Sequence, residues 1–323
     1  MSDPGTQPLV SVVCLTYNQE KYIAQTLDGF LAQQTSFPFE IIVHDDASRD
    51  KTFEIVDSYR ERHPNLIRVI RQSENQYSQG TSLPALVFKH ARAPFIAYCE
   101  GDDFWVDPLK LQVQADYLTE NPKVGLVFTD ANIFYENRNL TIHAYGRTTK
   151  KHIPTGDVRK TLLTSYWYKT CTSMFRADLV QGYEQVALKL RARMEDYVMW
   201  LTIAGKSDVG YLDRPTTTYR VRAESASHFT NLTTFLRFRR SALKVTLYFN
   251  RLFGNLVDRS TLRDLYRKSI VEHCLQIGEY GKAFRMTRSM GEFAVQFMKV
   301  TMRSAALKIP GSWRLLRSNS NVD

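Results

Sequence analysis

The feature that most constrains the fold is an apolar segment near the N-terminus, followed by a helical pattern and a second apolar segment. Residues 9–15 form a valine-rich apolar run, as a strand buried on both faces requires. After Asn18, which can cap a helix, residues 23–31 carry apolar side chains at helical spacing, and residues 39–43 form the next apolar run. This succession predicts a βαβ unit whose first strand is central in a sheet.

The same alternation of strand and helix patterns continues along the chain. Further strands are expected at residues 66–70, 95–99 and 125–129, with helices at 82–92 and after Asp107, the expected N-cap before Pro108. Residues 130–160 are polar and aperiodic, which predicts a long loop or an irregular excursion over the sheet, and from residue 233 only helical patterns remain. We therefore expect an α/β protein with a mostly parallel, Rossmann-like sheet flanked by helices and a C-terminal helical appendage.

Charge is distributed unevenly along the 323 residues. The net charge is +10, and residues 230–323 contain 17 Lys and Arg against 6 Asp and Glu, so the rest of the chain is close to neutral. A basic C-terminal region suits an anionic membrane surface or a nucleic acid, and it equally suits a solvated helical face. With 43% hydrophobic and 24% charged residues, the composition excludes disordered and fibrous classes.

The cysteines and the apolar segments indicate where in the cell the protein is located. The four cysteines lie far apart without a CxxC pair, which predicts reduced core residues. The sequence contains neither an N-terminal apolar signal segment nor a run of 18 apolar residues. We expect a cytoplasmic protein.

Two acidic pairs follow directly on predicted strands. Asp45 and Asp46 come after the second strand, and Asp102 and Asp103 come after the strand at 95–99. In open α/β sheets this carboxyl edge binds ligands, and paired carboxylates there can hold ribose hydroxyls or a hard divalent cation. Turn formation and helix capping could explain one such pair, but two pairs at two strand ends favour a ligand site.

Two further segments contain clusters of charged and hydroxyl side chains. Glu195 and Asp196 precede a helical apolar pattern, where the helix dipole alone favours acids. Adjacent helical residues diverge by about 100°, so at most one of these two carboxylates should face a site. Residues 219–228 mix cations and hydroxyls without an apolar stripe, which predicts a mobile loop that contacts phosphate.

Taken in order, these segments resemble the inverting glycosyltransferases of family 2, which have the GT-A fold. The resemblance covers residues 9–228 and depends on the combination of five landmarks. They are the run from Val10 to Asn18, the turn from Asp45 to Ser48, the segment from Glu100 to Trp105, the pair Glu195–Asp196 and the segment from Tyr219 to Ser227.

The resemblance implies a reaction and a division of the chain. We expect transfer of a sugar, with inversion, from a nucleotide-diphosphate sugar, UDP favoured, to a glycan or lipid-linked acceptor in surface polysaccharide or lipid-linked glycan synthesis. Residues 1–8 would be a disordered N-terminus and 9–230 the GT-A nucleotide-sugar-binding catalytic domain. Residues 231–312 would be the basic helical region and 313–323 a flexible tail.

The resemblance also implies which residues bind the nucleoside of the donor. Thr16, Tyr17 and Asn18 would cradle the nucleoside, while Asp46 would hydrogen-bond the base with help from Asp45. These are donor-binding predictions for the carboxyl ends of the first two strands.

The remaining acids are expected to serve the diphosphate and the acceptor. Asp103 would coordinate Mg²⁺ or Mn²⁺ at the donor diphosphate, and Asp102 would reach the ribose or act as a second metal ligand. Asp196 would be the general base that takes the proton of the acceptor hydroxyl, with Glu195 as the alternative base. Metal charge would stabilise the departing diphosphate.

One position departs from the family pattern. Family members often carry a histidine two residues after the Tyr-Arg dipeptide, whereas this chain has Arg222. A metal-ligand role is excluded there, and Arg222, with Arg220, is expected to bind the donor by neutralising diphosphate oxygens. His228 is a weak substitute as a metal ligand.

The C-terminal region contains a basic amphipathic pattern at residues 284–308, with aromatic and aliphatic side chains on one face. Such a helix can lie on an anionic membrane, or it can dock on the catalytic domain or on a second subunit. A lipid-linked acceptor would suit a peripheral location on the inner face of the cell membrane.

Other function classes were weighed against this interpretation. A nicotinamide dehydrogenase would need G-x-G-x-x-G after the first strand, and a sugar nucleotidyltransferase would need a glycine-rich N-terminal loop; this sequence has neither. The remaining alternatives are a catalytically inactive GT-A scaffold and a basic nucleic-acid-binding protein. The acids kept at all three places favour the enzyme, and no nucleic-acid partner is expected.

Overall fold

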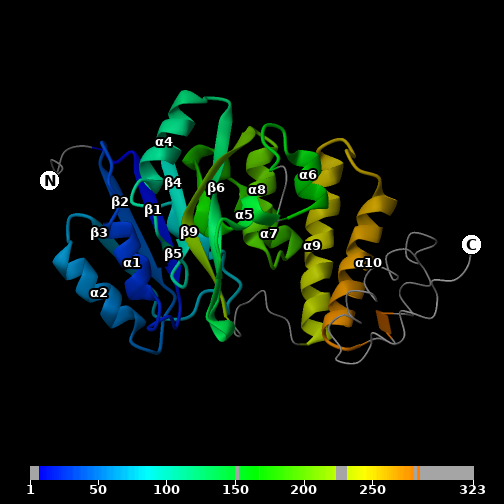
Figure 1. Ribbon diagram of the computed structural model, residues 1–323, viewed down its shortest axis with the longest axis horizontal. Coiled ribbons are helices and arrows are strands. Elements are labelled where there is room, and N and C mark those ends of the chain that lie inside the picture. The colour runs from blue at the N-terminus through cyan, green and yellow to red at the C-terminus, as the bar shows by residue number, and fades with distance from the viewer. Residues whose placement is uncertain (1–6, 150–152, 167, 223–230, 280–281, 284–323) are drawn as a thin grey trace, which may run out of the picture. The chain divides into compact units, whose positions relative to one another are not determined.

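The computed structural model describes residues 7–149, 153–166, 168–222, 231–279 and 282–283 (Figure 1). The chain divides into two compact units, residues 1–228 and 229–323. The predicted flexible tail at 313–323, the amphipathic pattern at 284–308 and most of the predicted disordered N-terminus lie outside the described residues.

The described part of the first unit is built on one nine-stranded sheet with the order β3-β2-β1-β4-β8-β6-β9-β5, in which β7 pairs with β6. The strands are β1 (Val10–Thr16), β2 (Phe39–Asp45), β3 (Ile67–Arg71), β4 (Phe95–Glu100), β5 (Phe104–Trp105), β6 (Val124–Tyr135), β7 (Leu140–Ile142), β8 (Ser173–Arg176) and β9 (Asp208–Val221).

Strands β3, β2, β1 and β4 are parallel, and β1 is in the interior of the sheet, as the apolar runs predict. Beyond β4 the sheet becomes mixed: β8 pairs antiparallel with β4 and β6, β9 runs parallel to β6, and β5 pairs antiparallel with β9. In the parallel part, Thr16 is opposite Asp45, and Leu15 is opposite Glu100. The carboxyl ends of β1, β2 and β4 therefore meet at one edge.

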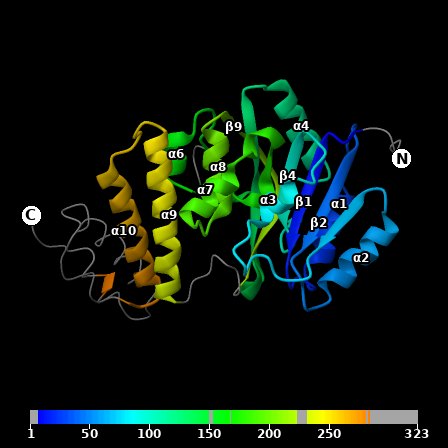
Figure 2. The same ribbon diagram turned by 180° about the vertical axis from the view of Figure 1, so that it is seen from behind.

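Helices cover both faces of this sheet (Figures 1 and 2). In the first unit they are α1 (Ile23–Leu31), α2 (Thr52–Arg62), α3 (Leu83–Phe88), α4 (Lys110–Glu120), α5 (Tyr145–Thr149), α6 (Arg159–Thr164), α7 (Tyr183–Leu190) and α8 (Glu195–Ala204). In the second unit they are α9 (Leu232–Leu252) and α10 (Arg259–Gln276).

Strand β4 shows how the two faces are buried. Ala97 and Cys99 belong to a core cluster with side chains of α1 and α4. Tyr98 points to the opposite face, where its ring packs edge-on against Phe88 of α3 at 5.6 Å. Alternate residues of a strand point to opposite faces, so a continuous apolar strand matches a sheet with helices on both sides.

The prediction for residues 130–160 is wrong in part. Strand β6 does not end near Thr129 but continues to Tyr135, and β7 and α5 follow it. Residues 130–135 mix polar, aliphatic and aromatic side chains in a short run, and they form a strand because β9 pairs with them along their whole length. Pairing between distant segments leaves little trace in a local pattern.

The first turn of α4 also differs from the expectation. The helix begins at Lys110 rather than at Pro108, and the Asp107 carboxylate accepts a hydrogen bond from the main-chain N–H of Leu109. The same carboxylate forms an ion pair with Arg214 of β9. Asp107 therefore has a structural role, as expected, but it also ties α4 to β9.

The second unit is helical in its described residues, as predicted. The Asn231 side chain caps α9 by accepting hydrogen bonds from the main-chain N–H groups of Thr233 and Thr234. The ring of Phe235 stacks on His273 of α10 with centroids 3.8 Å apart. Among the helices that the structure describes, none combines the length and the apolar composition needed to cross a bilayer.

All four cysteines are reduced and buried, which confirms their assignment as core residues.

Lys110 is a buried cation in the core beside the sheet. Its side chain is inaccessible to solvent, its ammonium lies 4.6 Å from the centroid of the Trp105 ring, and it donates a hydrogen bond to the Gln114 side chain. Burial lowers the pKa of Lys110 to about 7. In the unfolded chain a lysine keeps its proton up to about pH 10.4, so between about pH 7 and 10 the unfolded state binds more protons and stability rises with pH.

We predict that Lys110→Met raises the free energy of unfolding at pH 7 by about 1 to 3 kcal/mol, because it removes a buried charge and keeps an unbranched side chain. The gain should be smaller at pH 9, because releasing the Lys110 proton on folding costs less free energy as the pH approaches about 10.4. Urea unfolding of both proteins at the two pH values measures this. An equal difference at pH 7 and pH 9 would show that the Lys110 proton does not affect folding.

Candidate active site

The acids predicted at two strand ends lie along one edge of the sheet. Main-chain hydrogen bonds hold the turns together there: the N–H of Asp46 donates to the carbonyl of Thr16 at 3.0 Å, and that of Gly101 donates to Leu15 at 2.9 Å. The end of β1 is therefore flanked by the Asp45–Asp46 turn on one side and the Asp102–Asp103 turn on the other.

Asp46 is buried and shapes a loop. Its two carboxylate oxygens accept hydrogen bonds from the main-chain N–H groups of Gln76 at 2.7 Å and Tyr77 at 3.1 Å. Its main-chain carbonyl accepts a third hydrogen bond, from the Asn75 side chain. The carboxylate thus fastens the loop between β3 and α3, and its expected contact with a base stays a prediction.

Asp45 and Thr16 present unsatisfied polar atoms. One oxygen of the buried Asp45 carboxylate accepts a hydrogen bond from the N–H of Ser48, while the other oxygen and the Thr16 hydroxyl have no hydrogen-bond partner within the described residues. Burial raises the pKa of Asp45. Buried polar atoms are nearly always paired, so two unpaired ones at neighbouring strand ends indicate a missing ligand or water.

Tyr17 and Asn18 form the start of the loop after β1. Asn18 has a positive φ of 52°, a conformation that asparagine tolerates better than most residues. Its side-chain oxygen accepts a hydrogen bond from the N–H of Arg49, and its own N–H donates to the Ser48 hydroxyl. Asn18 therefore joins the loops after β1 and β2, whereas the Tyr17 side chain is exposed.

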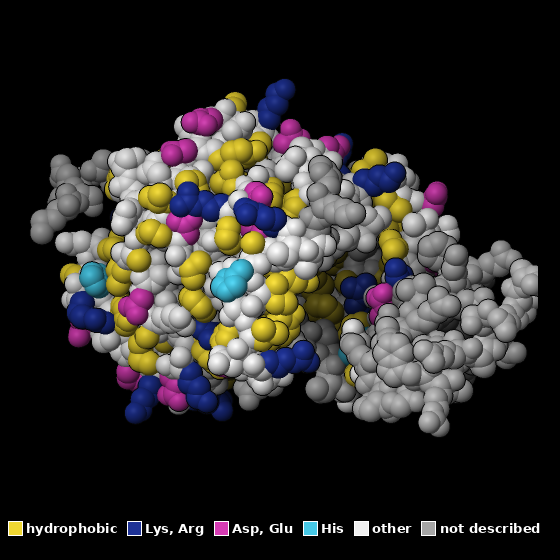
Figure 3. Space-filling model, viewed as in Figure 1, with side chains coloured by type: hydrophobic (Ala, Val, Ile, Leu, Met, Phe, Trp, Pro, Cys, Tyr) yellow, Lys and Arg dark blue, Asp and Glu magenta, His cyan; other side chains and the backbone are white. Residues whose placement is uncertain are grey.

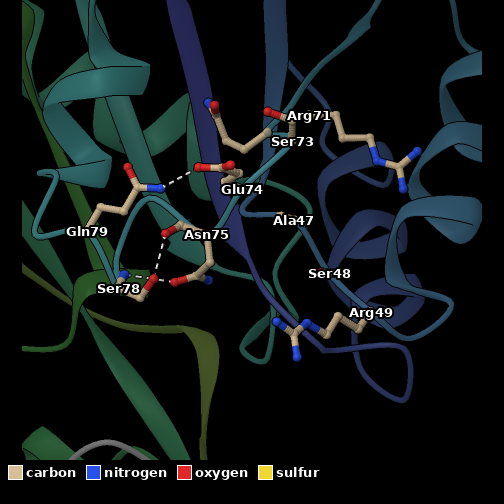
Figure 4. Close-up of a pocket in the computed structure, with 10 residues that line it drawn as sticks. Ala47, Ser48, Arg49, Arg71, Ser73, Glu74, Asn75, Ser78 and Gln79 are labelled. Atoms are coloured by element: carbon tan, nitrogen blue, oxygen red, sulfur yellow. Dashed lines mark hydrogen bonds between the residues drawn. The ribbon is translucent and has the colours of Figure 1, made fainter.

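An open polar pocket of about 720 Å³ lies at the ends of β2 and β3. Figure 4 shows residues 47–49 on one side of it and residues 73–79 on the other. Arg49 and Arg71 contribute positive charge, and the Arg71 guanidinium stacks on the Phe53 ring at 3.7 Å. Volumes of about 300–1,000 Å³ are typical of small-molecule sites. Sequence reasoning missed residues 71–79, although their run of polar side chains after a strand was a signal.

Asp102 and Asp103 differ sharply in their surroundings. Asp103 is only 2% exposed, and one of its oxygens accepts a hydrogen bond from the main-chain N–H of Arg220 at 2.8 Å. Burial, and then the neighbouring Asp102 charge, raise the pKa of Asp103 to about 8. Asp102 is less buried, and its carboxylate pairs with the Arg222 guanidinium at 2.5 Å.

Arg220 and Arg222 come from the end of β9, where residues two apart point to the same side. The two guanidinium carbons lie 4.8 and 4.9 Å from the centroid of the Tyr22 ring. Arg220 also donates to the Asp102 carbonyl at 2.9 Å and to the Gln25 side chain at 2.7 Å. The expected mobile loop thus begins as a strand, and its remainder, with His228, lies outside the described residues.

Asp196 and Glu195 occupy the first turn of α8 and point to different partners. Asp196 accepts hydrogen bonds from the Tyr166 hydroxyl and from the main-chain N–H of Tyr197, and Glu195 accepts one from the Ser82 hydroxyl at 2.5 Å. Burial raises the pKa of both carboxyl groups. Tyr166 lies in an aperiodic segment, so no sequence pattern pointed to it.

The four carboxylates of this region interact electrostatically. Burial raises the pKa of Glu100 strongly, and the charges of Asp103, Asp102 and Asp196 raise it further. The Lys169 ammonium opposes this by lowering the pKa of both Asp103 and Asp196. The charges at the end of β4 and at the N-terminus of α8 therefore influence one another.

The donor set does not fit a divalent cation in this arrangement. Asp103 is buried and hydrogen-bonded, Asp102 forms an ion pair with Arg222, and no cluster of three His, Cys, Asp or Glu side chains occurs within the described ranges. A hard cation seeks several accessible oxygens. The expected Mg²⁺ or Mn²⁺ stays a prediction.

Comparisons with solved structures define the fold. The mannosyltransferase PcManGT from Pyrobaculum calidifontis, solved with GDP-Man and Mn²⁺, matches with a TM-score of 0.57 and 16% identity over 94% of this chain and 82% of its own. S. aureus TarS 1-349 with UDP-GlcNAc matches with a TM-score of 0.53 and 19% identity over 83% of each chain. These likenesses confirm the expected GT-A fold.

Curated relatives share parts of the sequence. The putative glycosyltransferase EpsE of Bacillus subtilis is 27% identical over 221 residues, 68% of this chain and 74% of its own. The Escherichia coli UDP-Glc:alpha-D-GlcNAc-diphosphoundecaprenol beta-1,3-glucosyltransferase WfaP is 26% identical over 68% of this chain and 80% of its own. An uncharacterized protein of Mycobacterium tuberculosis is 43% identical over 128 residues, which is 40% of this chain but only 36% of that relative's length.

The family model described as glycosyl transferase family 2 matches residues 11–181, more than half of the chain. This range contains the parallel strands, the polar pocket and both acidic pairs at the sheet edge. The chain therefore belongs to glycosyl transferase family 2.

Proposed function

We propose that this glycosyltransferase moves a sugar from a nucleoside diphosphate sugar to an acceptor hydroxyl with inversion at the anomeric carbon. The observation that carries the proposal is the order of groups along one sheet edge. A polar pocket lies at β2 and β3, unsatisfied polar atoms lie at the end of β1, and acids with arginines lie at the end of β4. That order matches the base, the ribose and the diphosphate of a nucleoside diphosphate, in sequence.

The nucleoside is proposed to occupy the pocket between residues 47–49 and 71–79. Asp45 and Thr16 would satisfy their unpaired atoms by binding it, with Tyr17 and Asn18 closing the same side. Arg222 would face the diphosphate, and Arg220 would hold the Asp102–Asp103 turn beside it. A uridine nucleotide is favoured because the name of WfaP and the TarS complex both specify UDP-sugars, although the PcManGT complex contains GDP-Man.

Asp196 is proposed as the general base. It lies at the N-terminus of a helix beside the acids of β4, and burial raises the pKa of Asp196 toward the pH at which a base is most useful. Its carboxylate would take the acceptor proton as the acceptor oxygen bonds to the anomeric carbon and the diphosphate leaves from the opposite face. Glu195, whose carboxylate binds the Ser82 hydroxyl, is the alternative base.

The acceptor is proposed to be a glycan or lipid-linked glycan in surface polysaccharide synthesis. WfaP, named for a diphosphoundecaprenol-linked acceptor, supports this class. A protein using such an acceptor would work at the cytoplasmic face of the membrane, bound there through its basic C-terminal region.

A basic nucleic-acid-binding protein has less support. On the face seen in Figure 3, described Lys and Arg side chains lie among acidic ones and form no continuous basic stripe. Binding to the phosphate backbone would need such a stripe.

We predict that one of UDP, GDP and dTDP binds the full-length protein with micromolar affinity in calorimetric titrations, made both in Mn²⁺ and in EDTA. A nucleoside diphosphate carries the base and the diphosphate that the sheet edge would recognise. If none of the three binds in either buffer, the proposal fails, and an inactive scaffold or a nucleic-acid-binding role becomes the better explanation.

A matched pair of variants separates ligand binding from loop structure at the end of β2. We predict that Asp45→Asn weakens nucleotide binding about tenfold without loss of stability, because its free oxygen would face the ligand. Asp46→Asn should instead lower the free energy of unfolding by about 1–3 kcal/mol, because an amide cannot accept both loop N–H groups. Calorimetry measures nucleotide affinity, and urea unfolding measures stability, for both variants. Weakened nucleotide binding with intact stability in Asp46→Asn would show that Asp46, and not Asp45, contacts the base.

A second pair of variants tests the general base. We predict that Asp196→Asn lowers the transfer rate by a factor of about 10²–10⁴ while donor affinity is kept. The Tyr166 hydrogen bond lowers the pKa of Asp196, so Tyr166→Phe should move the acidic limb of the kcat profile to higher pH. An unchanged profile in Tyr166→Phe, or full activity in Asp196→Asn, would contradict the assignment.

A further inference from the structure

We propose that Arg222 supplies the positive charge that the donor diphosphate meets, so that donor binding needs no divalent cation. This inference rests on the proposed function. It begins from the ion pair at the end of β4, where the Arg222 guanidinium lies 2.5 Å from the Asp102 carboxylate. Both side chains are largely buried, with 17% and 16% of their surfaces exposed.

The surroundings hold Arg222 at this place. Its guanidinium carbon lies 4.9 Å from the centroid of the Tyr22 ring, which stacks a second guanidinium, that of Arg220, at 4.8 Å. The Tyr22 hydroxyl in turn donates a hydrogen bond to Glu136 at 3.2 Å. A planar guanidinium on an aromatic ring is oriented as well as attracted, so Arg222 is positioned before any ligand arrives.

The two arginines have different tasks. Arg220 is committed to the protein: its N–H binds the Asp103 carboxylate, and its guanidinium binds the Asp102 carbonyl and Gln25. Arg222 pairs with the partly exposed Asp102 carboxylate and also interacts with Tyr22, whose hydrogen bond helps raise the pKa of Arg222. A guanidinium has five donors, so Arg222 can bind diphosphate oxygens through one edge while another stays on Asp102.

A divalent cation would have to displace this arrangement. Asp103 is 2% exposed and hydrogen-bonded to Arg220, so Asp102 would be the accessible carboxylate. A cation on Asp102 would lie where the Arg222 guanidinium lies, and two such positive groups repel at short range. The fixed arginine and the mobile cation are therefore alternatives for one position.

The positive charge of Arg222 also suits the transfer reaction. During transfer the acceptor oxygen bonds to the anomeric carbon, the bond from that carbon to the diphosphate oxygen breaks, and the acceptor proton goes to Asp196. The departing diphosphate gains negative charge, which a preorganised guanidinium stabilises without reorganisation. No additional reactant is needed for this balance.

The test is calorimetric titration of the nucleoside diphosphate that binds, UDP or GDP, into the full-length protein in EDTA and in Mn²⁺. The wild-type affinities in the two buffers should agree within about threefold. Arg222→Met should weaken binding in EDTA by about tenfold to a hundredfold, since a hydrogen bond to a charged group contributes about 1.5–3 kcal/mol. Arg222→Lys should lose less, because it keeps the charge and loses the fork.

A control and a second variant guard against misfolding. Arg60→Met removes an arginine from an exposed ion pair with Asp57 in the last turn of α2, at the opposite edge of the sheet, and should leave binding unchanged. Asp102→Asn releases Arg222 and should preserve or tighten binding in EDTA; if Asp102 were instead a metal ligand, the variant would lose the binding seen in Mn²⁺. Thermal melting checks that each variant is folded.

The outcomes separate the two proposals. Binding that requires Mn²⁺, or unchanged affinity in the folded Arg222→Met variant, overturns the role of Arg222 and leaves the glycosyltransferase proposal intact. Absence of nucleotide binding in both buffers overturns the proposed function itself.

Discussion

The link between Arg220 and the turn after β4 is the interaction on which the site depends. The Arg220 N–H binds the Asp103 carboxylate, and its guanidinium binds the carbonyl of Asp102, so two segments more than 100 residues apart are joined by charge-assisted hydrogen bonds. Without this link Asp103 would be a buried carboxylate lacking its main-chain partner, which is costly in a low-dielectric interior. The link also carries the neighbouring Arg222 to Asp102.

The acids near this link can lie close together because cationic side chains and hydrogen-bond donors lie among them. The charges of Asp102, Asp103 and Asp196 raise the pKa of Glu100, and Asp102 also raises that of Asp103, yet Lys169 and the two arginines lie among these acids. A buried charge is stable when it is paired and hydrogen-bonded. The acids and the cations at this edge of the sheet thus partly neutralise one another.

The sequence predicted the parallel half of the fold well and the rest poorly, for a physical reason. Strands such as β1 and β2 are buried on both faces, so their apolar runs are visible locally, and the acids that follow them mark the sheet edge. Strand β9 is defined by its pairing with β6 and β5, and its polar end resembles a loop until those partners are known. For the same reason no local pattern indicated Tyr166. The adjacent acids Asp45 and Asp46 could not be assigned different roles either, because their partners lie in distant segments.

The register of β9 decides which side chains reach the acids. Its pairing with β6 shifts around Asp130, so that residues near Arg214 bulge out before regular pairing resumes and sets Arg220 opposite Phe134. The ion pair between Arg214 and Asp107 and the main-chain hydrogen bonds to Asp130 hold this irregular stretch. Since a slip of one residue would turn both arginines to the other face, these contacts control which charged side chains lie beside the acids.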